Sequence, residues 1–182
     1  EVVLSLKERG YRVAAGLMEA QYFGVPQLRP RVFFIGSRIG QPSLPKATSN
    51  PIPCGVALRD VDPDEVLLPQ NPGQRLMASH LQPGENGGDV MKRLGRKEAW
   101  FGVKMNHPDH ISFTIVKQDR GCNTLYHWKR RHISIREALV LTGFPATYVL
   151  PGAFGDRWAR IGNSVAPPMS REIVKQVLGR IG

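Results

Sequence analysis

Residues 21–36 read QYFGVPQLRPRVFFIG, a segment rich in glycine and proline that continues into an apolar run. Its second half contains the apolar run Val32 to Ile35 and ends at a glycine, a pattern typical of a strand buried on both faces. Upstream, residues 11–18 also have a strand-like pattern, and residues 2–9 suit the tail of an amphipathic helix that Gly10 ends. The first third of the chain therefore predicts a helix followed by two strands.

Between the two predicted strands lies an elbow whose glycine and prolines control the backbone. Gly24 permits unusual backbone angles, while the two prolines hold the residues before them extended. Alternate side chains of an extended segment project to one side, which predicts a comb of polar groups formed by Gln27, Arg29 and Arg31. An exposed edge strand with ordinary surface arginines is the alternative interpretation of such a short pattern.

The last third of the chain predicts three helices. Ser134 and Glu137 have the spacing of a capping box, so a helix begins directly after Ser134, and Gly143 is placed to end it. A second short helix is expected over residues 155–161, closed by a turn at residues 162–165. Two prolines then fit the first turn of a final helix, whose apolar stripe is formed by Met169, Ile173, Val174, Val177, Leu178 and Ile181.

Composition bounds the class of protein. Apolar residues make up 41% and charged residues 22% of the 182 positions, which fits a globular chain and argues against wholesale disorder. Twenty-five Lys and Arg against fifteen Asp and Glu give a net charge of +10, which favours an anionic partner such as nucleic acid. Prolines and glycines concentrate in residues 41–88, so the middle third is expected to be rich in loops.

Membrane and metal partners are not expected. No apolar run approaches the roughly 18 residues that a membrane helix needs, and the first residues lack a signal-peptide pattern, which predicts a soluble, cytoplasmic protein. The two cysteines, Cys54 and Cys122, are too few for a disulfide framework. Cys122, His127 and His132 lack a fourth ligand at suitable spacing, so no metal site is predicted.

Three segments together resemble the DNA cytosine carbon-5 methyltransferases. Residues 22–31 look like motif VIII of that family, residues 134–145 look like motif IX, and residues 160–168 look like motif X. The three agree with the family in type, order and separation. Residues 113–116 are similar to a short Thr-Ile segment late in the family's target recognition domain, whereas residues 41 to about 110 match only in position and loop-rich character.

The resemblance implies an α/β fold, the C-terminal portion of a Rossmann-like S-adenosylmethionine-dependent methyltransferase domain with an inserted loop-rich target recognition lobe. Residues 1–40 would end the catalytic domain with the motif VIII hairpin, and residues 41–132 would form the target recognition domain. Residues 133–182 would return to the catalytic domain and pack with residues 1–40 as one unit, leaving the middle as a separate lobe.

The family's nucleophile lies in a Pro-Cys segment well before motif VIII, and its glycine-rich cofactor loop also lies upstream. Neither segment precedes motif VIII here, and Pro53-Cys54 falls after it, in the wrong order for a nucleophile. A helix already running at residue 1 without an initiator Met is expected for a cut chain. The partner implied is an N-terminal catalytic portion, on the same or a companion chain.

In the family's reaction a cysteine thiolate adds to carbon 6 of a flipped cytosine, and carbon 5 then attacks the methyl group of S-adenosylmethionine. The resemblance makes Arg31 the candidate for stabilising charge at the ring's O2, with Arg29 beside it to orient it and to meet a DNA phosphate. Gln27 would buttress the loop and is also a candidate DNA contact. Near the methionine end of the cofactor, the resemblance places Asn163, Ser164 and Val165.

The middle segment would read double-stranded DNA through base edges and phosphates. Candidate phosphate contacts are Arg93, Arg96, Lys97, Lys104, Lys117, Arg120, Lys129, Arg130 and Arg131. Candidate base contacts are Asn106, Gln118 and Asn123, while Trp100, Trp128 and Trp158 are expected to anchor the core. A DNA-binding or regulatory module without catalysis and an RNA cytosine methyltransferase remain alternatives, because basic charge does not separate DNA from RNA.

Overall fold

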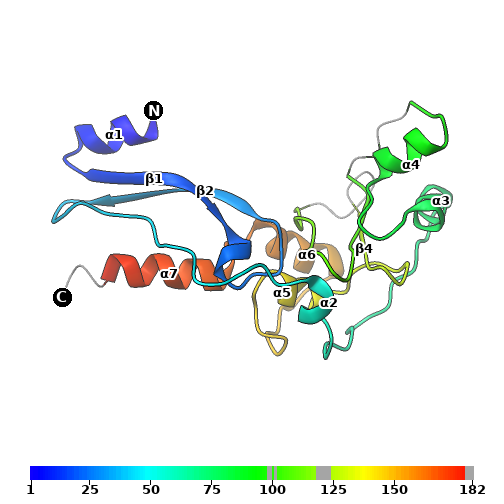
Figure 1. Ribbon diagram of the computed structural model, residues 1–182. Coiled ribbons are helices and arrows are strands. Elements are labelled where there is room, and N and C mark those ends of the chain that lie inside the picture. The colour runs from blue at the N-terminus through cyan, green and yellow to red at the C-terminus, as the bar shows by residue number, and fades with distance from the viewer. Residues whose placement is uncertain (98–99, 101, 118–123, 179–182) are drawn as a thin grey trace.

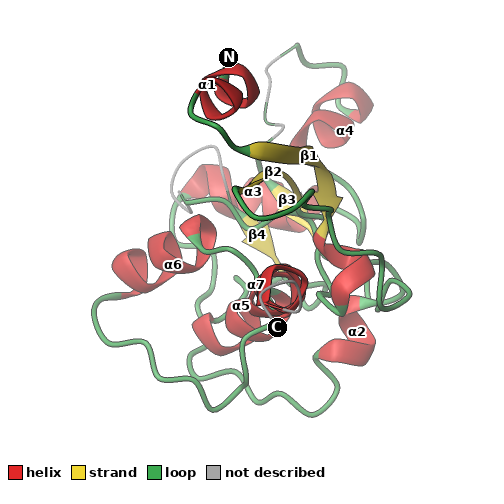
Figure 2. Cartoon of the chain, turned by 90° about the vertical axis from the view of Figure 1, so that its left-hand side faces the viewer, coloured by secondary structure: helices red, strands yellow, loops and turns green. Residues whose placement is uncertain are grey.

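The computed structural model describes residues 1–97, 100, 102–117 and 124–178. A long hairpin lies at one end of the molecule together with the first and last helices, and a pair of short helices lies at the other end (Figure 1). Helices also lie between the two ends (Figure 1), and Figure 2 shows long loops connecting the elements. None of the described helices is long and apolar enough to cross a membrane.

The hairpin carries the start of the chain. Helix α1 (Val2–Glu8) ends at a left-handed Gly10 with φ of 80°, and strand β1 (Arg12–Glu19) follows. A single 3-10 turn, η1 (Ala20–Phe23), and a left-handed Gly24 then turn the chain into strand β2 (Pro30–Ser37). The strands pair antiparallel from Arg12 opposite Ser37 to Glu19 opposite Pro30, so the predicted helix and two strands are present.

Exposure alternates along β2, which corrects the prediction of a strand buried on both faces. Phe33 packs inward, whereas the side chains of Val32 and Phe34 are 58% and 44% exposed. Leu17, the cross-strand partner of Val32, is also exposed. A two-stranded sheet has a core on one face only, so the apolar run marks a second face that no described residue covers.

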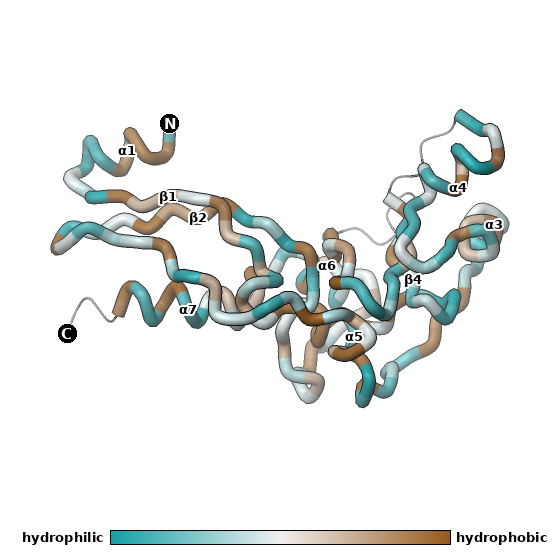
Figure 3. The backbone as a smooth tube through the Cα atoms, viewed as in Figure 1, coloured by the Kyte–Doolittle hydropathy of each residue, from teal (hydrophilic) through white to brown (hydrophobic). Residues whose placement is uncertain are grey.

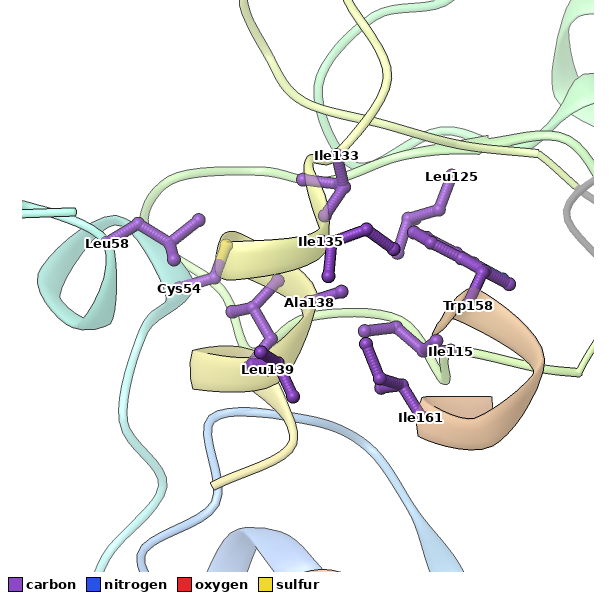
Figure 4. Packing of buried hydrophobic residues seen from close by; sticks show 11 residues of the cluster. Cys54, Leu58, Ile115, Leu125, Ile133, Ile135, Ala138, Leu139, Trp158 and Ile161 are labelled. Atoms are coloured by element: carbon purple, nitrogen blue, oxygen red, sulfur yellow. The ribbon is translucent and has the colours of Figure 1, made fainter. Parts of the chain in front are cut away.

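The central core forms around helix α5 (Ile135–Leu141) and helix α6 (Phe154–Asn163), with α2 (Cys54–Ala57) beside them. Ile135, Leu139 and Trp158 interdigitate with side chains from the middle third of the chain (Figure 4). The predicted capping box is present, because Ser134 Oγ accepts from the amide of Glu137 and the Glu137 carboxylate accepts from the amide of Ser134. Helix α6 extends through Asn163, so the turn begins at Ser164 rather than at residue 162.

Helix α7 (Pro167–Leu178) packs on the hairpin end of the molecule. Met169 and Ile173 join a core cluster with Met18, Phe23 and Val25. The outward part of the predicted stripe is exposed at Val174, Val177 and Leu178, and Ile181 lies outside the described residues.

The far end of the molecule is built from α3 (Pro72–His80) and α4 (Gly87–Arg93), which we call the outer helix pair. The pair shares a core cluster with two short parallel strands, β3 (Lys104–Met105) and β4 (Leu125–Tyr126). The middle third is thus divided, because its residues Cys54, Leu58, Ile115 and Leu125 join the central core around α5 and α6. The packing of α7 on the hairpin agrees with the prediction that residues 1–40 and 133–182 pack together. The middle segment is not one separate lobe, because part of it packs into the central core. The three domain boundaries remain a proposal.

Candidate active site and nucleic-acid interface

Arg29 joins three segments that are distant in the sequence. Its side chain is 1% exposed, and Nη2 donates to the main-chain oxygens of Gly162 and Ser164 at 2.7 and 2.6 Å. Nη1 donates to the oxygen of Ile115 at 2.9 Å and to Oε1 of Gln27 at 3.2 Å. One guanidinium therefore links the elbow, the end of α6 and the Thr-Ile segment at residues 113–116.

Gln27 is fully buried and completes this network. Its amide nitrogen lies 3.3 Å from both the oxygen of Leu141 and Oγ1 of Thr142, at the end of α5. Its amide oxygen accepts from the amide of Ile115 at 3.3 Å. The side chains of Gln27 and Arg29 thus point into the protein. Their burial argues against the predicted contacts of these two residues with DNA.

The environment of Arg29 explains how a cation can be buried without a carboxylate. Burial, and secondarily the nearby charge of Arg31, lower the pKa of Arg29 to about 10, so the side chain stays charged at neutral pH. The carbonyls it meets at Gly162 and Ser164 belong to the last turn and cap of α6, where the helix dipole is negative and carbonyls lack partners within the helix.

Arg31 lies two residues after Arg29, at the start of β2, and is half-buried. Its guanidinium donates to the oxygen of Pro30 at 2.7 Å, and the other donors meet no partner among the described residues. Arg31 thus keeps free guanidinium donors next to the anchored residue, and contact with a developing negative charge requires such donors.

The end of α6 carries the predicted cofactor residues. Asn163 is exposed, and its side-chain amide has no partner in the described part of the chain. Ser164 Oγ donates to the oxygen of Ile161 at 2.7 Å and keeps its lone pairs, while Val165 is 46% exposed. A free side-chain amide and a hydroxyl are groups that fit the polar methionine end of S-adenosylmethionine.

An open groove lies along α7 and is also lined by Val165. It has a volume of about 730 Å³ and is mostly apolar, with Phe144, Val165, Val174 and Leu178 among its lining residues. Its polar lining residues are Ser170, Arg171 and Lys175, all on α7.

Gly162 allows α6 to touch the Thr-Ile segment. A Cβ atom at this position would lie 2.5 Å from the amide nitrogen of Lys117 and 2.5 Å from the carbonyl carbon of Val116. Backbone atoms cannot move aside as a flexible side chain can, so only glycine permits this approach. The same close contact lets Trp158 Nε1 donate to the oxygen of Val116 at 2.9 Å.

Arg131 pairs with a buried acid and is not a free cation. Its two terminal nitrogens donate to the two carboxylate oxygens of Glu137 at 2.7 and 2.6 Å. Burial raises the pKa of Glu137, but the bonds from Arg131 and Ser134 lower it by more, so the net pKa lies below its usual range. His127 Nε2 lies 3.7 Å from the same carboxylate, and burial, followed by the charge of Arg131, lowers the pKa of His127 to about 4.

The other predicted DNA contacts divide into engaged and free cations. Arg130 donates to main-chain oxygens of α3, and Arg93 pairs with Glu85 at 2.6 Å. Lys104 is half-buried and lies 5.2 Å from the ring centroid of Phe113. Four described candidates are exposed without a side-chain partner in the described ranges: Arg96, Lys97, Lys117 and Lys129.

Asn106 is buried, and its side chain bonds Ser112 and the amide of Phe113, so it is not placed to read a base. Arg120, Gln118, Asn123 and Cys122 lie outside the described residues. The tryptophans were predicted correctly, because Trp158 is buried while Trp100 and Trp128 are partly buried against core clusters.

Cys54 is fully buried in α2, with Sγ 2.9 Å from the oxygen of His107. Burial raises the pKa of the thiol to about 11, which keeps it protonated at neutral pH. A buried, protonated thiol cannot act as a nucleophile, which agrees with its position after motif VIII.

Two functional contacts had no signal in the sequence pattern. One is the pairing of Arg131 with Glu137. The capping box explained the position of Glu137 without a second partner, so nothing in the sequence pointed to Arg131. The close contact at Gly162 is the other, because a glycine near a helix end is normally interpreted as part of a turn.

The solved structures similar to this chain are methyltransferases of the S-adenosylmethionine-dependent class, which confirms the predicted fold class. One is the Dnmt2 methyltransferase of S. pombe, with a TM-score of 0.60, 15% identity, and coverage of 100% of this chain and 62% of that chain. The chain belongs to the family of C-5 cytosine-specific DNA methylases, whose family model matches residues 1–179.

Two curated relatives illustrate the similarity within the family. The type II methyltransferase M.AplI of Arthrospira platensis is 28% identical over 97% of this chain and 50% of its own length. The type II methyltransferase M.BbvI of Brevibacillus brevis is 28% identical over 93% of this chain and 49% of its own length. The chain therefore spans about half the length of these relatives.

Proposed function

We propose that this chain is the C-terminal part of a DNA cytosine carbon-5 methyltransferase and supplies DNA recognition, the arginine that contacts the flipped cytosine, and one end of the cofactor site. The observation that carries the proposal is the contrast between two arginines in one motif. Arg29 is buried and fixed by carbonyls, while Arg31 keeps its donors free. Family membership gives this contrast its chemical meaning.

Arg31 would act on the ring of the target base. Addition of a thiolate to carbon 6 moves electron density toward O2 and N3, so a fixed guanidinium at O2 stabilises the transition state more than the ground state. The anchoring of Arg29 supports this role, because it holds the backbone on which Arg31 stands. Arg29 would thus orient Arg31 by anchoring the backbone beside it. We do not propose that Arg29 contacts a phosphate, because its side chain is buried.

The exposed C-terminal end of α6 would hold part of the cofactor. S-adenosylmethionine, when bound, supplies the methyl group that carbon 5 of the cytosine accepts. Asn163 and the Ser164 hydroxyl would bind its methionine end, with Val165 beside them. The remaining walls would come from the N-terminal catalytic portion.

Exposed apolar surface supports the need for that portion. Leu17 and Val32 are 64% and 58% exposed on the hairpin, and Val174 and Leu178 are 51% and 58% exposed on α7. The hydropathy colouring shows apolar stretches in the hairpin (Figure 3). A neighbouring domain that covers these faces would bury them, as contiguous apolar surface requires.

The exposed cations Arg96, Lys97, Lys117 and Lys129 would bind phosphates of double-stranded DNA. Arg96 and Lys97 follow α4, Lys129 lies in the turn next to Arg130, and Lys117 lies against Gly162 of α6. The positions of these charges support a recognition surface made by the middle segment.

Coexpression tests the proposal. We expect the chain, together with a polypeptide that carries the Pro-Cys segment and the glycine-rich cofactor loop, to transfer labelled methyl groups to cytosine carbon 5 in duplex DNA. The chain alone should transfer none. Transfer to RNA but not to duplex DNA would replace the substrate in the proposal, and transfer by the chain alone would overturn the division of roles.

A further inference from the structure

Arg130 and Arg131 are adjacent, and their side chains join different parts of the molecule. Arg131 pairs with Glu137 at the start of α5 in the central core, at 2.6 and 2.7 Å. Arg130 donates to main-chain oxygens at the end of α3, in the outer helix pair: those of Ala78, Ser79 and Leu81, the last two at 3.1 and 3.2 Å. The tight turn at residues 127–131 therefore lies between the two cores.

The backbone of Arg130 is in the left-handed conformation, which is uncommon for a residue other than glycine. Its φ is 61°, and it is the only non-glycine residue with positive φ in the described ranges. Left-handed backbone is unfavourable for an arginine, so the surrounding contacts must hold it there. The amide of Arg130 donates to the oxygen of His127 at 2.9 Å, which closes the turn and aims the side chain at α3.

The receiving end is a helix C-terminus. Carbonyls in the last turn of a helix lack partners within it, and the helix dipole makes them attractive to a cation. Arg93 of α4 donates to the oxygen of His80 at 2.6 Å, so two arginines share this end of α3. Arg93 ties the two outer helices to each other, while Arg130 ties them to the turn.

We infer that Arg130 is a positioning residue that fixes the outer helix pair against the central core through the turn shared with Arg131, and is not a phosphate contact. The inference rests on the proposed function only in giving the pair a DNA-facing role. Its neighbour Lys129 is exposed, and its ammonium has no partner among the described residues, so Lys129 fits the phosphate role that sequence reasoning gave to both.

The test compares Arg130→Gln, Arg130→Gly and Lys129→Gln in the 182-residue chain. Hydrogen exchange is measured at the amides of α3 and of α5, and binding to a duplex of mixed sequence is titrated at several salt concentrations. Arg130→Gly relieves the left-handed strain, so it keeps the turn while it removes the guanidinium.

Both Arg130 variants should speed exchange at the end of α3 by about tenfold and leave α5 unchanged, because a local tie is lost. Their salt dependence of binding should match that of the unaltered chain. Lys129→Gln should instead lower the logarithmic salt slope by about 0.9, the contribution of one phosphate contact, and leave hydrogen exchange unchanged.

A reduced salt slope with unchanged α3 exchange in both Arg130 variants would show a phosphate contact and overturn the inference. Equal acceleration in α3 and α5 would show a general loss of stability and would also overturn it. Failure of the unaltered chain to bind DNA would count against the proposed function, while the exchange measurements would still decide the role of Arg130.

Discussion

Arg29 donates a hydrogen bond of 2.6 Å to the main-chain oxygen of Ser164, across 135 positions of the sequence. The bond joins the residue that precedes β2 to the residue that follows α6. It links the segment that carries the proposed base contact, Arg31, to the segment that carries the proposed cofactor contact, Ser164. Motifs VIII and X are thus coupled through a buried cation.

Replacing Arg29 by Met should lower the free energy of unfolding by about 3 kcal/mol or more, because several buried carbonyls lose a charged donor. Arg29→Lys should recover only part of this loss, since an ammonium cannot reach two sides of the site as a planar fork does. Denaturant unfolding measures both, with Arg12→Met on the exposed start of β1 as the control. Equal stability of Arg29→Met and the control would show that the network contributes nothing.

Gly162→Ala should destabilise the chain and separate α6 from residues 116–117, because the new Cβ would meet backbone atoms at 2.5 Å. Gly40→Ala is the matched control, since a Cβ there has no atom within 4 Å. Thermal unfolding of the two variants gives the comparison. A Gly162→Ala variant as stable as Gly40→Ala would mean that the two segments do not pack this closely.

His127 should make stability depend on pH. Its pKa is lowered to about 4 in the folded chain, whereas an unfolded histidine titrates near 6.5, so the unfolded state binds more protons between these values. The contribution is fully present above pH 6.5 and is lost as the pH falls toward 4, by about 3 kcal/mol in all. Unfolding measured at a series of pH values should show this fall, and His127→Gln should flatten it. An unchanged profile in that variant would assign the fall to other groups.

DNA binding by the 182-residue chain should be dominated by phosphates. The chain has a net charge of +10, and the proposal assigns the rest of the pocket for a flipped base to the N-terminal catalytic portion, so the chain should show weak sequence discrimination and a steep fall in affinity with salt. The logarithmic slope should be about 0.9 per phosphate neutralised. Titration of labelled duplex at several salt concentrations measures it, with transfer RNA as competitor. A shallow slope, or no binding at low salt, would assign the positive charge to another partner.

Local signals predicted the helices and strands of the first and last thirds, but they did not predict α2, α3, α4, β3 or β4 in the middle third. Ser134 and Glu137 are a self-contained cap, Gly10 adopts the predicted left-handed backbone, and Pro167 begins the last helix. Each of these depends on residues close in sequence, and tertiary contacts did not override them.

Contacts over long sequence distances could not be predicted. Period-two spacing placed Gln27, Arg29 and Arg31 on one side, but the spacing cannot say whether that side faces water or carbonyls 86 to 135 residues away. For the same reason Arg130 and Arg131 looked like surface cations, while their partners lie on α3 and α5. The apolar run of β2 overstated burial because half of its side chains face away from the described core.

The rate of the chemical step in Arg31 variants decides whether this arginine acts on the reacting base. Single-turnover methyl transfer to duplex DNA would be measured in the complete enzyme with Arg31→Ala, Arg31→Lys and the control Arg12→Ala. We expect Arg31→Ala to lower the rate by roughly a hundredfold to a thousandfold, with DNA affinity nearly unchanged and poor rescue by lysine. A weakened affinity with an unaltered rate would contradict the account and make Arg31 a phosphate contact.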